Sequence, residues 1–197
     1  VAPDEVIIIE EAAVAIEQAE LYDETKRRLA REQQLNALAH ALGGEMELEH
    51  LFPRLLPLVA ELAGADASTV IMADGRANCL LRPYSYNLPE WLPADFVQNE
   101  NSESGQVFAF SLPVVINDYA AHTSAQPEWV EAGIRSMIGV PLSVGGETTG
   151  ALAVFRTRAV EPFDEEAVSA VEAAARLASV AIQRARLFQE ERERRQE

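Results

Sequence analysis

The last part of the chain, from Phe163 to Glu197, contains neither glycine nor proline and is rich in Ala, Leu, Glu, Arg and Gln. Such a stretch predicts one long helix, and the rest of the fold has to cover its apolar side. Apolar residues recur along it at alternating steps of three and four, the spacing typical of helices that pair in coiled coils. A second apolar stripe lies beside the first, so we expect one to face the domain and one a partner. We assign the dimer seam to Val168, Val171, Ala175, Ala178, Ile182 and Ala185.

The N-terminal region is also free of glycine and proline, from Asp4 to Leu42, and predicts a second long helix. Its segment VAIEQAELYDETKRR, which begins at Val14, recurs as VAIQRARLFQEERERR, which begins at Val180. A repeat at domain-sized spacing indicates that the first helix closes a preceding copy of the same domain; the alternative is two acidic amphipathic helices that are alike in composition only. We expect an N-terminal linker helix at 1–46, one domain at 47–188, and the start of a C-terminal linker helix at 189–197.

The middle of the chain has the features of β-structure. Ser68–Ala73 and Cys79–Tyr86 flank DGRAN, while Ser136–Val144 and Glu147–Thr157 flank two glycines, so each pair predicts a hairpin. A helical or irregular segment at LPEWLPADF, a weak strand at PVVIN and a short helix near PEWVEAG lie between the hairpins. Strands and helices do not alternate regularly, which favours an α+β fold with a central antiparallel β-sheet and helices against one face.

Before the first hairpin, the segment HLFPRLLPLVAELAGAD has apolar residues at helical spacing and predicts a helix that faces the core. Pro57 lies inside this helix, where a proline removes a backbone donor. We therefore expect a bend or a late start.

The charge balance argues against two classes of partner. The chain has 32 acidic and 16 basic residues and a formal net charge of −16 at pH 7, so nucleic acids and anionic membrane surfaces would repel it. No apolar run reaches the roughly 20 residues that span a bilayer. The first residues lack the basic start of a secretory signal, and one cysteine cannot form an internal disulfide, so we expect a cytoplasmic protein.

Three segments, in their order and spacing, resemble the GAF domain family: SGQVFAFSLPVVIND, GIRSMIGVPLSVGGETTGALAVF and EPFDEEAVSAVEAAARLASVAIQRARLFQE. The resemblance extends from about Leu48 to Phe188. It implies a helix bundle on one face of the sheet and, on the other, a small-molecule pocket under short helices and loops. It also implies a regulatory module, often one of a tandem pair, that forms a parallel homodimer and acts on an output domain in the same chain, such as a histidine kinase.

Several residues of these segments have clear structural uses. Gly150 opens the wholly apolar strand ALAVF, which we expect in the middle of the sheet, buried on both faces. Gly139 and Pro141 indicate a close backbone approach and a break in strand pairing. Asp118 is suited to capping a turn, and Asp164 to capping the last helix.

The sequence offers no set of catalytic or metal-binding residues. Cys79 is the one cysteine, whereas methionine sulfoxide reductases that resemble this family need a second thiol to resolve a sulfenic acid. The histidines, His40, His50 and His122, are scattered without metal-ligand spacing. We therefore expect a non-catalytic module without a metal. Two alternatives stay open: a redox enzyme of the methionine sulfoxide reductase type, and a purely structural dimerising connector.

Aromatic residues gather where the pocket implied by the resemblance and its cover would lie, which suits a small planar ligand. The alternative is that these rings only fill the space between the sheet and its cover. No cofactor can be named from them. The candidate pocket residues are Tyr84, Tyr86, Trp91, Phe96, Phe108 and Trp129, with Arg135 and Ser136 as polar anchors.

Overall fold

The computed structural model describes residues 48–74, 79–97, 103–158 and 161–195, together with residues 16, 18–19, 21–22, 25–26 and 29 near the N-terminus. The chain divides into two compact units, Val1–Ala37 and Leu38–Glu197. The described residues of the first unit are helical, and Thr25 Oγ1 donates a hydrogen bond to the carbonyl of Leu21 at 2.7 Å. The rest of the predicted linker helix at 1–46, including most of the repeated segment, lies outside the described residues.

The second unit is built on an antiparallel sheet, as the hairpins of the sequence predict. Its described strands are β1 (Ala67–Ala73), β2 (Cys79–Tyr86), β3 (Asp95–Val97), β4 (Val114–Ile116), β5 (Ser136–Val144) and β6 (Glu147–Arg156). Their order across the sheet is β3-β2-β1-β6-β5-β4. Every residue from Ala151 to Phe155 in β6 is buried, which confirms the prediction of a central strand covered on both faces.

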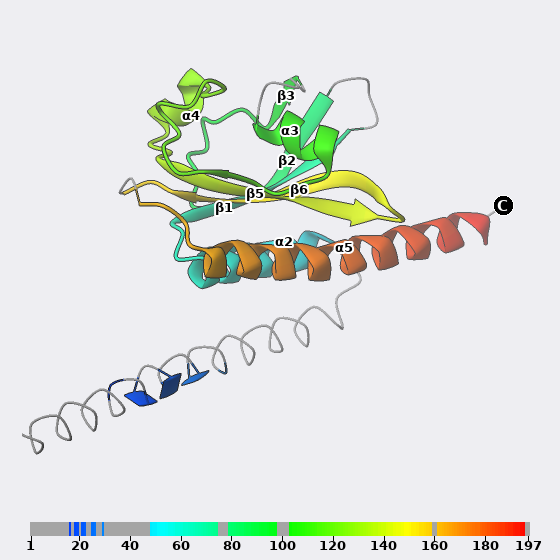
Figure 1. The fold of residues 1–197 in the computed structure, drawn as a ribbon. Helices are drawn as coiled ribbons and strands as arrows, with labels where there is room; N and C mark the ends of the chain where they lie inside the picture. The colour runs from blue at the N-terminus through cyan, green and yellow to red at the C-terminus, as the bar shows by residue number, and fades with distance from the viewer. Residues whose placement is uncertain are drawn as a thin grey trace, which may run out of the picture. The chain divides into compact units, whose positions relative to one another are not determined.

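Two helices, α2 (Leu48–Leu62) and α5 (Glu165–Arg194), cover one side of the sheet, which we call the helix face (Figure 1). The helix α2 begins at Leu48 and includes Pro57, so the expectation of a late start is wrong. Asp164 caps α5, since its Oδ1 accepts a hydrogen bond from the Ala167 amide at 2.7 Å, as predicted.

The stripe that the sequence assigns to a dimer seam lies inside the domain. The side chains of Val171, Ala175, Ala178, Ile182 and Ala185 are buried within the single chain, and Val168 is partly exposed. The physical reason is that α5 packs against both the sheet and α2, so its own domain buries these residues. This corrects the assignment of these residues as a surface free for a second copy.

The opposite side of the sheet, which we call the cover face, lies under α3 (Glu103–Phe110), α4 (Pro127–Glu131) and the loops around them (Figure 1). The helix α4 corresponds to the predicted PEWVEAG helix, whereas α3 was not predicted. None of the helices in the described part of the chain combines the length and apolar character needed to cross a lipid bilayer.

Candidate functional site

A small cavity lies between the cover face of the sheet and the elements above it. Its volume is about 30 Å³, which is room for a water molecule and far less than the roughly 300–1,000 Å³ of a typical ligand pocket. It is lined by Ile71, Val107, Tyr119, Gln126, Trp129, Met137, Gly139, Ala151, Ala153 and Phe155. None of these lining residues is an acid, a lysine, an arginine or a histidine, so the site is uncharged and mostly apolar.

The floor of the cavity follows from strand geometry. Side chains alternate between the two faces of a sheet, so Gly139 of β5 and Ala151 and Ala153 of β6 point to the cover face together. These residues are small and leave space above the backbone. A Cβ atom at Gly139 would lie 3.3 Å from Val107 Cγ2, so a side chain of α3 approaches the floor closely there. The break in strand pairing that the sequence predicts at Gly139 and Pro141 is wrong, because both residues pair with β6 in continuous register.

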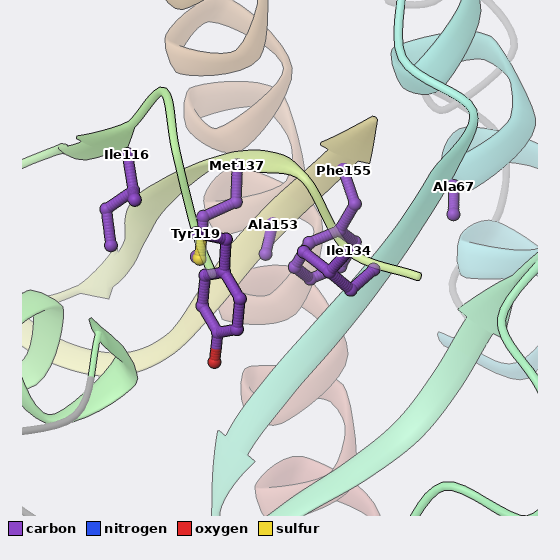
Figure 2. Packing of buried hydrophobic residues seen from close by; sticks show 7 residues of the cluster. All are labelled: Ala67, Ile116, Tyr119, Ile134, Met137, Ala153 and Phe155. Carbon is purple, nitrogen blue, oxygen red and sulfur yellow. The ribbon is translucent and has the colours of Figure 1, made fainter. Parts of the chain in front are cut away.

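The walls come from a buried cluster that Figure 2 shows gathered over the strands of the sheet. Tyr119 lies in the loop after β4 and is fully enclosed; its amide donates to the Arg135 carbonyl at 2.7 Å, and its hydroxyl accepts from the Gln126 amide at 3.2 Å. The Trp129 ring of α4 lies over Phe155, with ring centroids 5.3 Å apart. The cover is thus held by one tyrosine and one tryptophan.

Of the predicted pocket residues, Trp129 lines the cavity and Phe108 packs against the neighbouring cluster of Ile71, Leu80, Val107 and Ala151. Tyr86 and Trp91 are exposed at 40% and 54% and line no part of the cavity. The side chain of Phe96 lies outside the described residues. The aromatic cluster is therefore only partly a pocket.

Tyr84 lies on the helix face, where its ring stacks on Phe52 of α2 at a centroid distance of 5.0 Å. The reason is a β-bulge. Val70 pairs with Tyr84 and Met72 with Leu81, so β2 has one residue more than β1 in this interval, and the alternation of its side chains shifts. Burial, and secondarily the charge of Glu49, raise the pKa of Tyr84.

The two predicted polar anchors do not face the cavity. The Arg135 side chain is exposed, and the backbone of this residue carries its contacts to Tyr119 and Arg156. Ser136 is fully buried, but its Oγ donates to the Glu161 carbonyl at 3.2 Å, ahead of α5. The sequence alone cannot tell on which face of β5 Ser136 lies, or that Arg135 precedes the strand with its side chain in solvent.

Most of the lining residues were missed by sequence reasoning, above all Tyr119, Gln126, Met137, Ala151 and Ala153. Alternation along β5 and β6 was the available signal. Once one residue of a central strand is placed on the cover face, every second residue follows. The contribution of the loop after β4 has no comparable periodic signal.

Arg82 forms a second buried polar feature near the cover. Its guanidinium donates from Nε to the Pro93 carbonyl at 3.1 Å, from Nη2 to the Leu92 carbonyl at 2.6 Å and from Nη1 to Ser85 Oγ at 2.6 Å. Burial lowers the pKa of Arg82. These bonds tie the connection before β3 to the sheet, which is a structural role.

The other reactive side chains that the structure describes have local, structural contacts. Cys79 at the start of β2 is a free, partly buried thiol. His122 Nδ1 lies 2.7 Å from Ser124 Oγ within one turn, and the Asp118 Oδ1 of the same loop accepts from the Ala121 amide at 3.3 Å, as expected of a turn cap. In the ranges that the structure describes, no three His, Cys, Asp or Glu residues are grouped so as to hold a metal ion.

The sequence of this chain matches a known family, and its fold is similar to that of known proteins. The GAF domain family model matches residues 47–182. A search of curated proteins finds no match. Among solved structures, the GAF domain of a phosphoenolpyruvate-protein phosphotransferase from Coxiella burnetii is similar at a TM-score of 0.71 and 19% identity, over 80% of this chain and 95% of that chain.

Two further structures show the range of functions found on this fold. Free methionine-R-sulfoxide reductase from Neisseria meningitidis, in complex with its substrate, has a TM-score of 0.69 and 19% identity, over 83% of this chain and 93% of that chain. A domain assigned to a two-component sensor histidine kinase protein from Sinorhizobium meliloti has a TM-score of 0.59 and 16% identity, over 74% and 97%. At these identities the similarity shows the fold alone.

Proposed function

The chain belongs to the GAF domain family, and we propose that it is a non-catalytic sensory module, which pairs with a second copy through its terminal helices and relays a signal to an output domain. One observation carries this proposal. The helix α5 packs on the sheet whose other face lines the cavity, and from Arg186 to Arg195 it continues with exposed side chains wherever they are described. A change at the cavity therefore has a continuous helix through which to act.

The proposed pairing surface is an outward stripe of α5. Val180 and Leu187 are exposed at 47% and 58%, and Ala173 and Leu177 are partly exposed. With Arg184 they recur at steps of four and three, the heptad spacing of paired helices. Arg184 can lay its apolar stem along such a seam while its charged end stays in water. This stripe replaces the buried one as the seam of a parallel homodimer.

Mass measurement by light scattering at micromolar concentration tests the pairing. The parent chain is expected to be a dimer, and the double substitution Val180→Glu with Leu187→Glu is expected to give a monomer, because it places like charges along the seam. Leu112→Glu is the matched control, since Leu112 is exposed at 61% away from the stripe and its substitution should leave the dimer intact. A monomeric parent, or a dimer that survives both glutamates, would contradict the seam.

For the ligand we propose a small, uncharged, planar molecule. The lining supplies aromatic and aliphatic contacts and two polar side chains, those of Tyr119 and Gln126. An unpaired charge would not be compensated there and would be costly to bury. The cavity has to widen on binding, and the Trp129 ring on Phe155 is the part of the cover whose displacement would open it.

Tryptophan fluorescence tests this site directly. The chain has two tryptophans, so Trp91→Phe leaves Trp129 as the one emitting indole. A neutral aromatic probe that does not emit in the tryptophan range, such as benzamide, should change the emission and raise the melting temperature, while the charged analogue benzoate should do neither. Native mass spectrometry of freshly purified protein shows whether a small molecule is retained. Equal responses to both probes would refute the uncharged ligand, and no response would favour the structural connector.

The redox alternative has its own test. The solved structure of a methionine-R-sulfoxide reductase shares the fold, and Cys79 is the one cysteine here. Reduction of free methionine sulfoxide that is present in the parent and lost in Cys79→Ser would establish an enzyme and overturn the non-catalytic proposal. We place the module in the cytoplasm, where a lone thiol stays reduced.

A further inference from the structure

The three residues before the α5 cap, Glu161–Phe163, are held by side chains from the ends of three strands. We call this segment the α5 leader. Asn117 Oδ1 accepts from the Phe163 amide at 3.0 Å. Ser136 Oγ donates to the Glu161 carbonyl at 3.2 Å. Arg156 Nη1 donates to the carbonyls of Glu161 and Pro162 at 3.1 and 3.0 Å. Each residue of the leader is thus held through its backbone.

Each of these three holding residues is the chain neighbour of a residue at the cavity. Asn117 follows Ile116, which belongs to the cavity cluster. Ser136 precedes Met137, and Arg156 follows Phe155, and both of these neighbours line the cavity. Because adjacent residues of a strand point to opposite faces, a shift of the backbone at a wall residue also moves the residue that holds the leader. The sheet itself is therefore the connection between the two faces.

Backbone hydrogen bonds join the three strand ends to one another. The Tyr119 amide donates to the Arg135 carbonyl at 2.7 Å, and the Arg135 amide donates to the Arg156 carbonyl at 2.8 Å. Tyr119 is itself a cavity wall. A displacement of the tyrosine thus reaches the arginine that holds the leader through two short bonds.

On the helix face, the leader determines where α5 begins. Phe163 is buried at 7% exposure, and the Arg156 guanidinium lies over its ring at 4.2 Å from the centroid. Asp164 follows immediately and caps the helix through the Ala167 amide. Arg156 Nε also donates to the Gly64 carbonyl at 3.0 Å, which fixes the arginine to the end of α2. A shift of the leader therefore moves the cap.

We propose that the α5 leader is the coupling element of this module: Asn117, Ser136 and Arg156 transmit a change in the cavity walls to the first turn of α5. The inference rests on the proposed sensory function and names the residues that regulate its output. Phe163 and its partners would act as positioning residues, since none of them lines the cavity. The observable consequence is that packing in the cavity and order at the α5 cap depend on one another.

The amide hydrogen exchange rate of Ala167 measures the order of the α5 cap. In this experiment, a substitution that fills the cavity perturbs its walls in place of a bound ligand. Ala153→Val adds two methyl groups to a cavity of about 30 Å³ and has to displace its walls. We expect this substitution to change the Ala167 exchange rate by about fivefold, the ratio that corresponds to one hydrogen bond of about 1 kcal/mol. In an Asn117→Ala background the change should fall below about twofold, because the bond to Phe163 is missing.

Two control backgrounds make the result specific. Asn117→Asp keeps an oxygen acceptor for the Phe163 amide and should restore the full response to Ala153→Val. Arg158→Ala removes an exposed arginine that pairs with Asp66 at 3.2 Å and does not hold the leader, so the response should persist. An equal response with and without the Asn117 side chain, or no response in the parent, would overturn the proposal.

A second pair of variants tests the same coupling in case Ala153→Val or Asn117→Ala does not fold. Arg156→Lys keeps the positive charge but cannot hold two carbonyls in the planar manner of arginine, and Gly139→Ala adds a smaller group to the cavity floor. The same loss of response is expected for this pair. None of these measurements uses a ligand or the dimer, so their failure refutes the coupling element while the fluorescence and mass measurements judge the sensory function separately.

Discussion

The helix face and the cover face of the same sheet are packed in different ways. On the helix face, α2 contributes Leu51, Phe52 and Leu55, all without solvent exposure, and the alanines of α5 let it lie close to the strands. On the cover face, two short helices and loops lie over glycine and alanine, and a cavity is left between them. Dense packing resists change, whereas a partly filled layer can move at lower cost.

The N-terminal ends of α5 and α4 also differ, and again the element on the helix face is the better stabilised. The 30-residue helix α5 is capped by Asp164, but the 5-residue helix α4 follows Gln126, whose side chain makes no cap hydrogen bond. No residue of α4 is fully buried. Stability is therefore concentrated on the helix face, and the cover face is the side on which a ligand can change the packing.

The largest expected difference comes from removing the same side chain on each face. Leu152 and Leu80 are both fully buried on strands, the first on the helix face and the second beside α3. We expect Leu152→Ala to lower the free energy of unfolding by about 4–5 kcal/mol and Leu80→Ala by about 2–3 kcal/mol, because the short cover can collapse into the space. Urea denaturation measures both. Equal losses would show that the two faces are equally rigid.

A smaller difference in stability is expected when a methyl group is added, rather than removed, at one glycine of β6 and one glycine of β5. A Cβ at Gly150 would lie 2.7 Å from the Ile71 carbonyl oxygen, which is backbone of the paired strand β1, whereas one at Gly139 would meet a methyl of Val107 at 3.3 Å. Gly150→Ala should destabilise by about 1–3 kcal/mol. Gly139→Ala should change stability by less than about 1 kcal/mol, since the loss of chain entropy in the unfolded state offsets the crowding.

Thermal melting of the two glycine variants, with the parent as reference, provides the measurement. A greater loss of stability in Gly139→Ala than in Gly150→Ala would contradict this prediction. That result would mean that α3 is fixed over the floor as firmly as β1 is fixed beside β6.

The helix caps provide the third contrast. Asp164→Ala removes the acceptor of the Ala167 amide and should cost about 1 kcal/mol, while Asp164→Asn should cost less because it retains an oxygen. Gln126→Ala should be near neutral through the cap, since Gln126 makes no such bond. Gln126→Ser, which supplies one, should stabilise the cover by about 0.5–1 kcal/mol. Denaturation curves of the four variants test this, and a costly Gln126→Ala would show that its side chain stabilises the cover from within the cavity.

The central strands and the long helix α5 are predicted better from the sequence than the short elements of the cover face, for physical reasons. The apolar strand that opens at Gly150, the two-glycine hairpin and the cap at Asp164 are local signals, and all three are present. The short helix α3 has no strong apolar periodicity, and β3 has only three residues. Elements of this size are set by what they pack against, which a local pattern does not contain.

Two errors at the candidate site have a common origin. The apolar stripe of Val171 and Ala175 was assigned to a partner, although the domain itself covers it. Tyr84 was assigned to the pocket, although a bulge turns it toward Phe52. In both cases the sequence shows that a side chain will be buried but not which surface buries it, since this depends on tertiary packing and on one inserted residue.

The smallest predicted effect concerns the pH dependence of Tyr84, which the bulge places on the helix face. Its pKa is raised by burial first and by Glu49 second, so the folded chain holds the phenol proton at a pH where the unfolded chain, near the ordinary value of about 10, has lost it. This contribution to stability is complete below the unfolded pKa and is lost as pH rises through the folded pKa. Tyr84→Phe should remove that alkaline loss. In an ultraviolet titration, Phe52→Leu should lower the pKa by admitting water, while Ala153→Val on the cover face should leave it unchanged; a response to the cavity substitution alone would mean that Tyr84 senses the cover face after all.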